Sequence, residues 1–129
     1  MDWETIICLL AGAYNVSLLV VTRAFTHKEF FDIDPNLFDK SGCIMVLLWG
    51  GVHISVAWSY ASVPFLFLVF ALEKLFYVVQ WILWIRKRAT WIDKVRETDI
   101  NTYIFFHAYG ILDALFFGPA LLTIFIMNL

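Results

Sequence analysis

The chain has 129 residues and a formal net charge of −2, and 62% of its residues are hydrophobic against 16% charged. A soluble domain is nearer half apolar and a quarter charged, and a single small domain cannot bury this much apolar surface. The composition therefore indicates an integral membrane protein, and it excludes soluble enzymes, disordered chains, disulfide scaffolds and nucleic-acid binders of the basic-patch kind.

Four stretches are long enough to cross a bilayer, which takes about 20 mostly apolar residues. They cover residues 3–22, 41–61, 64–85 and 101–126. The sequence thus predicts an all-α protein, a single membrane domain over residues 1–129 folded as an antiparallel four-helix bundle. Pro64 suits the first turn of the third helix, where its missing N–H costs nothing. The short segment 62–64 predicts a tight hairpin between the second and third helices.

The two longer connections mix apolar residues with charges, which is typical of segments in the headgroup layer. Residues 24–40 include several phenylalanines, among them Phe30 and Phe38. Residues 86–99 include Trp91 and Ile92, which we expect to contact the bilayer surface or a partner because the neighbouring cations are attracted to anionic headgroups. Asp99 or Asn101 can cap the fourth helix.

The cations predict the orientation. Four spans place both termini and the 62–64 turn on one side, and every Lys and Arg except Lys74 falls on the other side. Because cytoplasmic loops carry the Lys/Arg excess, both termini are predicted to be extracytoplasmic and the long loops cytoplasmic.

The two cysteines, Cys8 and Cys43, are expected to be free. They lie near opposite ends of their helices, with Cα atoms about 20 Å apart in depth. A disulfide bridges no more than about 7 Å.

Polar residues inside the spans are the site candidates, since intramembrane charges are costly and usually functional. The ligand or proton site candidates are Asn15, His53, Glu73, Lys74, Tyr77, Gln80, His107 and Asp113. At about 1.5 Å per residue, His53 and Glu73 lie at one depth on either side of the turn at Val63. The sequence predicts a polar cluster near the midplane in which His53 and Glu73 face each other.

Helical periodicity predicts four inward stripes, which need a shared interior because lipid cannot satisfy them. The stripes are Ala11, Asn15, Leu18 and Thr22; Val46, Gly50, His53 and Ala57; Glu73, Tyr77, Gln80 and Trp84; and Tyr103, His107, Gly110 and Ala114. Asp113 falls one step to the side of the last stripe.

Structural roles compete with functional ones for these residues. Asn15 is typical of a hydrogen bond between membrane helices. His107 suits a neutral ring bonded to a backbone carbonyl. Lys74 can snorkel or pair with a carboxylate, so that Glu73, Lys74 and Asp113 would form a structural ion-pair network.

Three functions fit the sequence. The first choice is an accessory or binding subunit that holds a lipid-like ligand or docks a membrane partner, which the 13 Phe, 6 Trp and 5 Tyr favour. The alternatives are a proton-coupled small carrier and a membrane-embedded acid–base enzyme acting on an apolar substrate. The chain resembles the small multidrug-resistance transporters in size and in its buried carboxylate. Their essential Glu lies in the first helix, where this sequence has only Asn15, so their function is not transferred.

No cofactor, metal or nucleic-acid partner is predicted. Haem between His53 and His107 is disfavoured because their depths differ by roughly 7–10 Å. A metal at His53, Glu73 and Asp113 is chemically permissible, but no metal-binding motif accompanies them.

Overall fold

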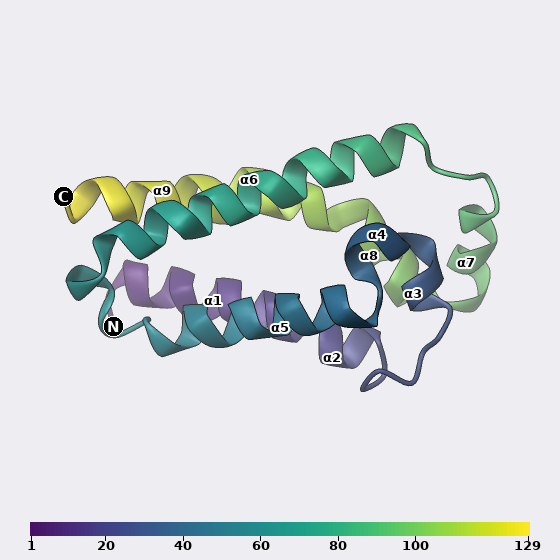
Figure 1. The fold of residues 1–129 in the computed structure, drawn as a ribbon, viewed down its shortest axis with the longest axis horizontal. Helices are drawn as coiled ribbons and strands as arrows, with labels where there is room; N and C mark the ends of the chain where they lie inside the picture. The colour runs from purple at the N-terminus through teal and green to yellow at the C-terminus, as the bar shows by residue number, and fades with distance from the viewer.

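A computed structural model describes residues 1–129, and it is helical with no strand (Figure 1). The elements in chain order are α1 (Trp3–Val16), α2 (Leu18–Val21), α3 (Phe30–Ile33), α4 (Pro35–Phe38), α5 (Lys40–Ser55), η1 (Tyr60–Ser62), α6 (Pro64–Arg86), α7 (Ile92–Thr98), α8 (Ile100–Leu112), η2 (Asp113–Phe117) and α9 (Gly118–Met127). Three helical segments are long and apolar enough to cross a membrane: Trp3–Val21, Pro64–Arg86 and Ile100–Met127.

The predicted second span is not among these three. α5 has 16 residues and ends at Ser55, so it rises about 24 Å, less than the roughly 30 Å hydrocarbon core. The Ser55 hydroxyl donates to the carbonyl of Gly51 at 2.7 Å, and serines recur at 59 and 62. Such hydroxyls compete for backbone hydrogen bonds, and the chain continues beyond α5 as turns and the short η1.

The long helices form two antiparallel pairs that face each other (Figure 1). α1 lies along α5, and α6 lies along the continuous segment α8–η2–α9. The predicted tight hairpin between α5 and α6 is therefore wrong. Aromatic rings lie between these two helices, as where His53 stacks on Phe70 with ring centroids 4.0 Å apart.

Two glycines bring α1 and α5 together. A Cβ placed on Gly50 would lie 3.0 Å from the carbonyl oxygen of Gly12, and one on Gly12 would lie 2.9 Å from that of Gly50. Small residues at a crossing allow this close backbone approach, which is common between membrane helices. The pairing of α1 with α5 follows from this contact.

The last helix contains one wide turn. Over Asp113–Phe117 the hydrogen bonding is π-helical, and the N–H of Gly118 donates to the carbonyl of Asp113, five residues earlier. Pro119 follows and has no N–H to give. Such π-bulges occur inside α-helices and are frequent at functional sites.

The long connections enter the core rather than lying wholly at its surface. Phe30 and Phe38 are buried against the rings of Phe105 and Phe106. Ile92, expected at the bilayer surface or on a partner, is only 1% exposed because it packs into the same cluster. Trp91 is 48% exposed, and its contact with the bilayer or a partner stays a prediction.

Both termini lie at one end of the molecule, together with η1, and the two long connections lie at the other end (Figure 1). Every Lys and Arg except Lys74 is therefore at the connection end. Cys8 and Cys43 are free and buried in different parts of the core, as expected.

Candidate functional site

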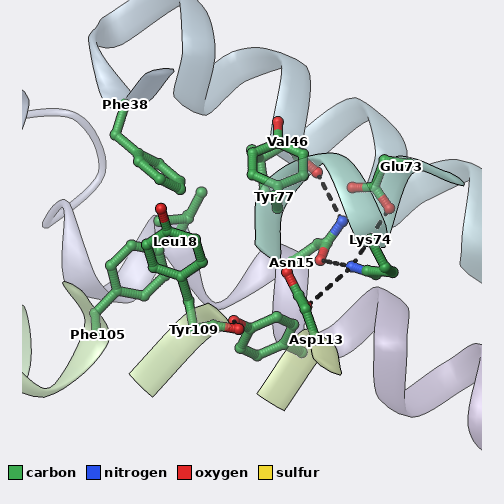
Figure 2. Close-up of a pocket in the computed structure, with 11 residues that line it drawn as sticks. Asn15, Leu18, Phe38, Val46, Glu73, Lys74, Tyr77, Phe105, Tyr109 and Asp113 are labelled. Atoms are coloured by element: carbon green, nitrogen blue, oxygen red, sulfur yellow. Dashed lines mark hydrogen bonds and ion pairs between the residues drawn. The ribbon is translucent and has the colours of Figure 1, made fainter. Parts of the chain in front are cut away.

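Lys74 is the centre of the buried polar cluster, with 1% of its surface exposed. Its Nζ donates to Asn15 Oδ1 at 2.9 Å and lies 3.6 Å from Glu73 Oε2 and 3.7 Å from Asp113 Oδ1 (Figure 2). The cluster thus joins α1, α6 and the start of η2. Of the eight predicted candidates, these four are brought together around one ammonium group.

Aromatic rings complete the surroundings of the ammonium group. Lys74 Nζ lies 5.5 Å from the ring centroid of Tyr14 and 5.6 Å from that of Phe117. Both distances are within the range of cation–π attraction. Tyr14 and Phe117 were not predicted, although Tyr14 is adjacent to Asn15 in the sequence.

Asn15 ties the two helix pairs together. Its Nδ2 donates to the carbonyl oxygen of Val46 on α5 at 3.3 Å, while its Oδ1 accepts from Lys74 on α6. The carbonyl of Val46 lies beside Asn15 because the Gly12–Gly50 crossing is one turn away. Asn15 therefore makes the interhelical hydrogen bonds expected from sequence.

The wide turn of the last helix begins at Asp113, whose side chain is directed at Lys74 (Figure 2). A Cβ on Gly118 would lie 2.9 Å from the Asp113 carbonyl oxygen, so a larger residue would force that turn apart. The sequence carried a signal for this feature in Gly118-Pro119, inside an otherwise uninterrupted span.

The charges in the cluster do not balance. One ammonium group faces two carboxylates, which leaves a net charge of −1 when all three groups are ionised. Glu73 Oε2 and Asp113 Oδ1 are too far from Lys74 Nζ for a hydrogen bond, and neither oxygen has another hydrogen-bond partner. Because an unpaired buried charge is costly, one further proton or cation beside the two carboxylates would balance the charge of the cluster.

The cavity beside the cluster is small. It has a volume of about 20 Å³ and is lined by Glu73, Asp113 and Tyr109, among others. The Tyr109 hydroxyl also lacks a hydrogen-bond partner. A space of this size holds about one water molecule, which would suit these three oxygens.

The histidines on α5 and α8 lie outside the cluster. His53 Nδ1 bonds to the carbonyl of Trp49 at 2.6 Å, and its Nε2 has no partner. The predicted pairing of His53 with Glu73 is wrong, since no hydrogen bond or ion pair joins them and Glu73 pairs with Lys74 instead. His107 bonds to the carbonyl of Tyr103 at 2.8 Å, the structural role expected for a neutral ring.

The two stripes predicted for the first and second spans are correct, since all eight of their residues are buried along α1–α2 and along α5 and the turn that follows it. On α6 the buried face is centred on Lys74 rather than Glu73, and Gln80 is half-buried without a polar partner. On the last helix the buried face includes Phe106, Tyr109 and Asp113, one step from the predicted one. Both differences are rotations of a helix about its own axis.

A lateral groove lies between α6 and the last helix and has a volume of about 410 Å³. Its lining is Leu68, Ala71, Leu72, Leu75, Val78, Asp113, Ala114, Gly118, Pro119 and Leu122. Asp113 is the only titratable residue among them, and it also lines the interior cavity. The sequence did not predict this groove. Its only sign in the sequence is the pair of small residues Ala114 and Gly118.

A second polar group lies outside the spans, at the connection end. Asp99 caps α8 by accepting from the backbone N–H of Thr102 at 3.2 Å and from its hydroxyl at 2.7 Å, and it also contacts His27. Burial alone would raise the pKa of the Asp99 carboxyl. The hydrogen bonds from Thr102 and His27 favour its charged form more strongly, so its pKa lies below the usual value. Asp99 is thus the cap expected from the sequence.

The chain has no group of three His, Cys, Asp or Glu side chains placed to hold a metal ion. Three apolar helices and a buried charged cluster are consistent with the class of helical membrane proteins. Comparison with protein-family models, with curated proteins and with solved structures finds no match to this chain.

Proposed function

We propose that the protein is a small polytopic membrane protein that acts as an accessory or binding subunit and holds its ligand or partner in the lateral groove. The observation that carries this proposal is the contrast between the two spaces beside Asp113. The interior cavity of about 20 Å³ has room for one water, whereas the groove of about 410 Å³ is of the size of small-molecule sites.

We further propose four spans, with α5 as the second. α5 lies along α1, and its outward residues Ile44, Met45 and Leu48 are exposed, as lipid-facing residues are. Trp58 and Tyr60 follow α5 and suit the membrane interface, where aromatic residues are enriched. With all loop cations at the other end, this arrangement makes both termini extracytoplasmic.

The test is purification into lipid nanodiscs followed by native mass spectrometry. The wild type is expected to retain a reproducible lipid-like molecule or partner subunit. Ala114→Phe fills the groove and is expected to abolish this retention, whereas Leu115→Phe, at an exposed neighbour outside the groove lining, is the matched control. Retention that is unchanged in Ala114→Phe, or none in the wild type, would contradict the proposal.

One observation favours a second candidate, the proton-coupled carrier. Two carboxylates share one ammonium group, so the cluster can take up a proton at the level of the bilayer interior. Proton uptake into vesicles that carry the wild type, and its loss in Asp113→Asn, would support this candidate. An acid–base enzyme is less well supported, because such chemistry uses two groups and only Asp113 reaches the groove.

A further inference from the structure

We infer that the lateral groove binds an apolar molecule that carries a cationic amine, which the excess negative charge of Glu73 and Asp113 attracts. The inference rests on the proposed binding function and names the chemical class of its ligand. It follows from three properties of the groove: its apolar walls, its open floor and the charge at its inner end.

The walls select an apolar body. Leu68, Leu72 and Leu75 line the groove from α6, and Leu122 lines it from α9. Leu72 and Leu75 are more than half exposed, so the groove opens on the side of the molecule that lipid would cover. An occupant therefore enters from the bilayer and gains by burying alkyl surface against leucine side chains.

The floor is kept open by small residues. Ala71 faces the groove from α6, and Ala114 and Gly118 face it from the last helix. Gly118 lies next to the cluster, since a Cβ there would be 2.9 Å from the Asp113 carbonyl oxygen and 3.8 Å from Cβ of Lys74. A side chain at this position would separate the groove from the charged residues.

The charge at the inner end selects a cation. Asp113 is shared by the groove and the interior cavity; its buried Oδ1 faces Lys74 at 3.7 Å without a hydrogen bond, so its charge is only partly offset. Lys74 offsets one of the two carboxylates, so one further positive charge would make the cluster neutral. When both carboxylates are ionised, an amine supplies that charge, whereas an uncharged lipid leaves it to a proton and a phosphate group is repelled.

The polar groups around Asp113 are consistent with this balance. Lys74 and Glu73 face it from α6, Tyr14 and Asn15 lie beside Lys74 from α1, and Tyr109 lines the same cavity from α8. Lys74 is the only one of these that carries a positive charge. An amine bound in the groove would therefore meet Asp113, with Lys74 and Glu73 behind it on the side of the interior cavity.

The experiment uses the full chain in phosphatidylcholine nanodiscs and two photoreactive probes of equal length, an alkyl diazirine amine and the matching alcohol. The amine is expected to label peptides from Pro64–Arg86 and from residues 113–122, and an excess of unlabelled decylamine is expected to prevent this. Labelling by the amine should exceed that by the alcohol by about tenfold, the preference that a buried charge pair supports. Equal labelling by the two probes would overturn the inference without any variant being made.

Two variants sharpen the result. Ala114→Phe and Asp113→Asn should each reduce amine labelling by about tenfold, and Leu115→Phe should leave it unchanged. Ala114→Phe removes no charged group from the cluster, so it keeps the test valid if Asp113→Asn does not fold. Amine labelling that persists in Ala114→Phe, or that maps elsewhere, would also overturn the inference.

The failure of this inference is distinguishable from that of the proposed function. If the amine does not bind but the purified protein retains a neutral lipid or a partner subunit through Ala114, the binding function stands and the ligand class is wrong. If neither probe labels the groove and nothing is retained there, both proposals fail.

Discussion

At the scale of single residues, the ammonium of Lys74 is what allows two carboxylates to stay buried. Lys74→Met would leave Glu73 and Asp113 without a cation. Removing one partner of a buried ion pair typically costs about 3–5 kcal/mol, so we expect the free energy of unfolding to fall by about that amount. The measurement is denaturant unfolding in mixed micelles, followed by circular dichroism.

The matched control for Lys74→Met adds Glu73→Gln and Asp113→Asn. This triple variant carries no charge in the cluster and should recover most of the lost stability, because no unpaired carboxylate remains. A Lys74→Met protein as stable as the wild type would mean that the ion pairs contribute nothing.

Outside the spans, stability should depend on the charge of Asp99. Its pKa is lowered in the folded state, so its contribution is present above the unfolded pKa of about 3.9 and is lost as the pH falls through the lower folded value. We expect Asp99→Asn to be less stable than the wild type at pH 6, with the difference shrinking as the pH falls below about 4. Unfolding titrations at a series of pH values measure this, and a pH-independent difference would contradict it.

The sequence identified the charged members of the site but not their arrangement. Glu73, Lys74 and Asp113 stand out because charges are rare in apolar runs. Lys74 was not identified as the centre because α6 is apolar on all sides, so its pattern does not fix the rotation of the helix. The same freedom explains why His53 and Glu73 share a depth by count but not a contact.

At the scale of elements, the crossing of α1 and α5 depends on Gly50. A Cβ there would lie 2.9 Å from Asn15 Cβ and 3.0 Å from the Gly12 carbonyl oxygen. Gly50→Ala is therefore expected to destabilise the protein by about 1–3 kcal/mol, as overpacking does. Gly51→Ala is the matched control, because no atom lies within 4 Å of its Cβ position and Ala favours the helix. Equal stability of the two variants would show that the crossing is not tight.

Phe38 on α4 closes the connection end of the interior cavity. Its ring contacts Tyr77, Phe105 and Tyr109, with the nearest centroid 4.9 Å away. Phe38→Ala should lower the free energy of unfolding by about 3–5 kcal/mol, the usual cost of deleting a buried phenylalanine. Phe65→Ala, at an exposed position, should have a small effect in the same unfolding assay. A small effect of Phe38→Ala would mean that the connection is not part of the core.

Three of the four predicted helices are correct to within a few residues, because their apolar runs are longer than any soluble helix requires. The sequence places the end of α5 too late, because residues 56–61 are apolar except for Ser59 and yet form turns, and hydropathy does not distinguish a turn from a helix. The wide turn at Asp113 depends on how Gly118 and Pro119 redirect hydrogen bonds, which periodicity does not register.

At the scale of the whole molecule, two antiparallel pairs meet around a nearly filled interior, and the larger space is a groove on the outside. The sequence predicted that consecutive long helices run antiparallel. Four such helices place both termini and the short 62–64 turn at one end and the two long connections at the other. The choice of partner for α5 was not predictable, since it depends on which faces fit closely. Gly12 and Gly50 decide it in favour of α1.

The positions of the two termini distinguish four membrane spans from three. An even number of crossings leaves both termini on the same side, whereas the three longest helices alone would leave them on opposite sides. Reporter domains that are active only in the cytoplasm, or only outside it, can be fused in turn to Met1 and Leu129. We predict that both termini report an extracytoplasmic position, because the loop cations lie at the other end. Termini on opposite sides would show that α5 does not cross the membrane and would contradict the four-span arrangement.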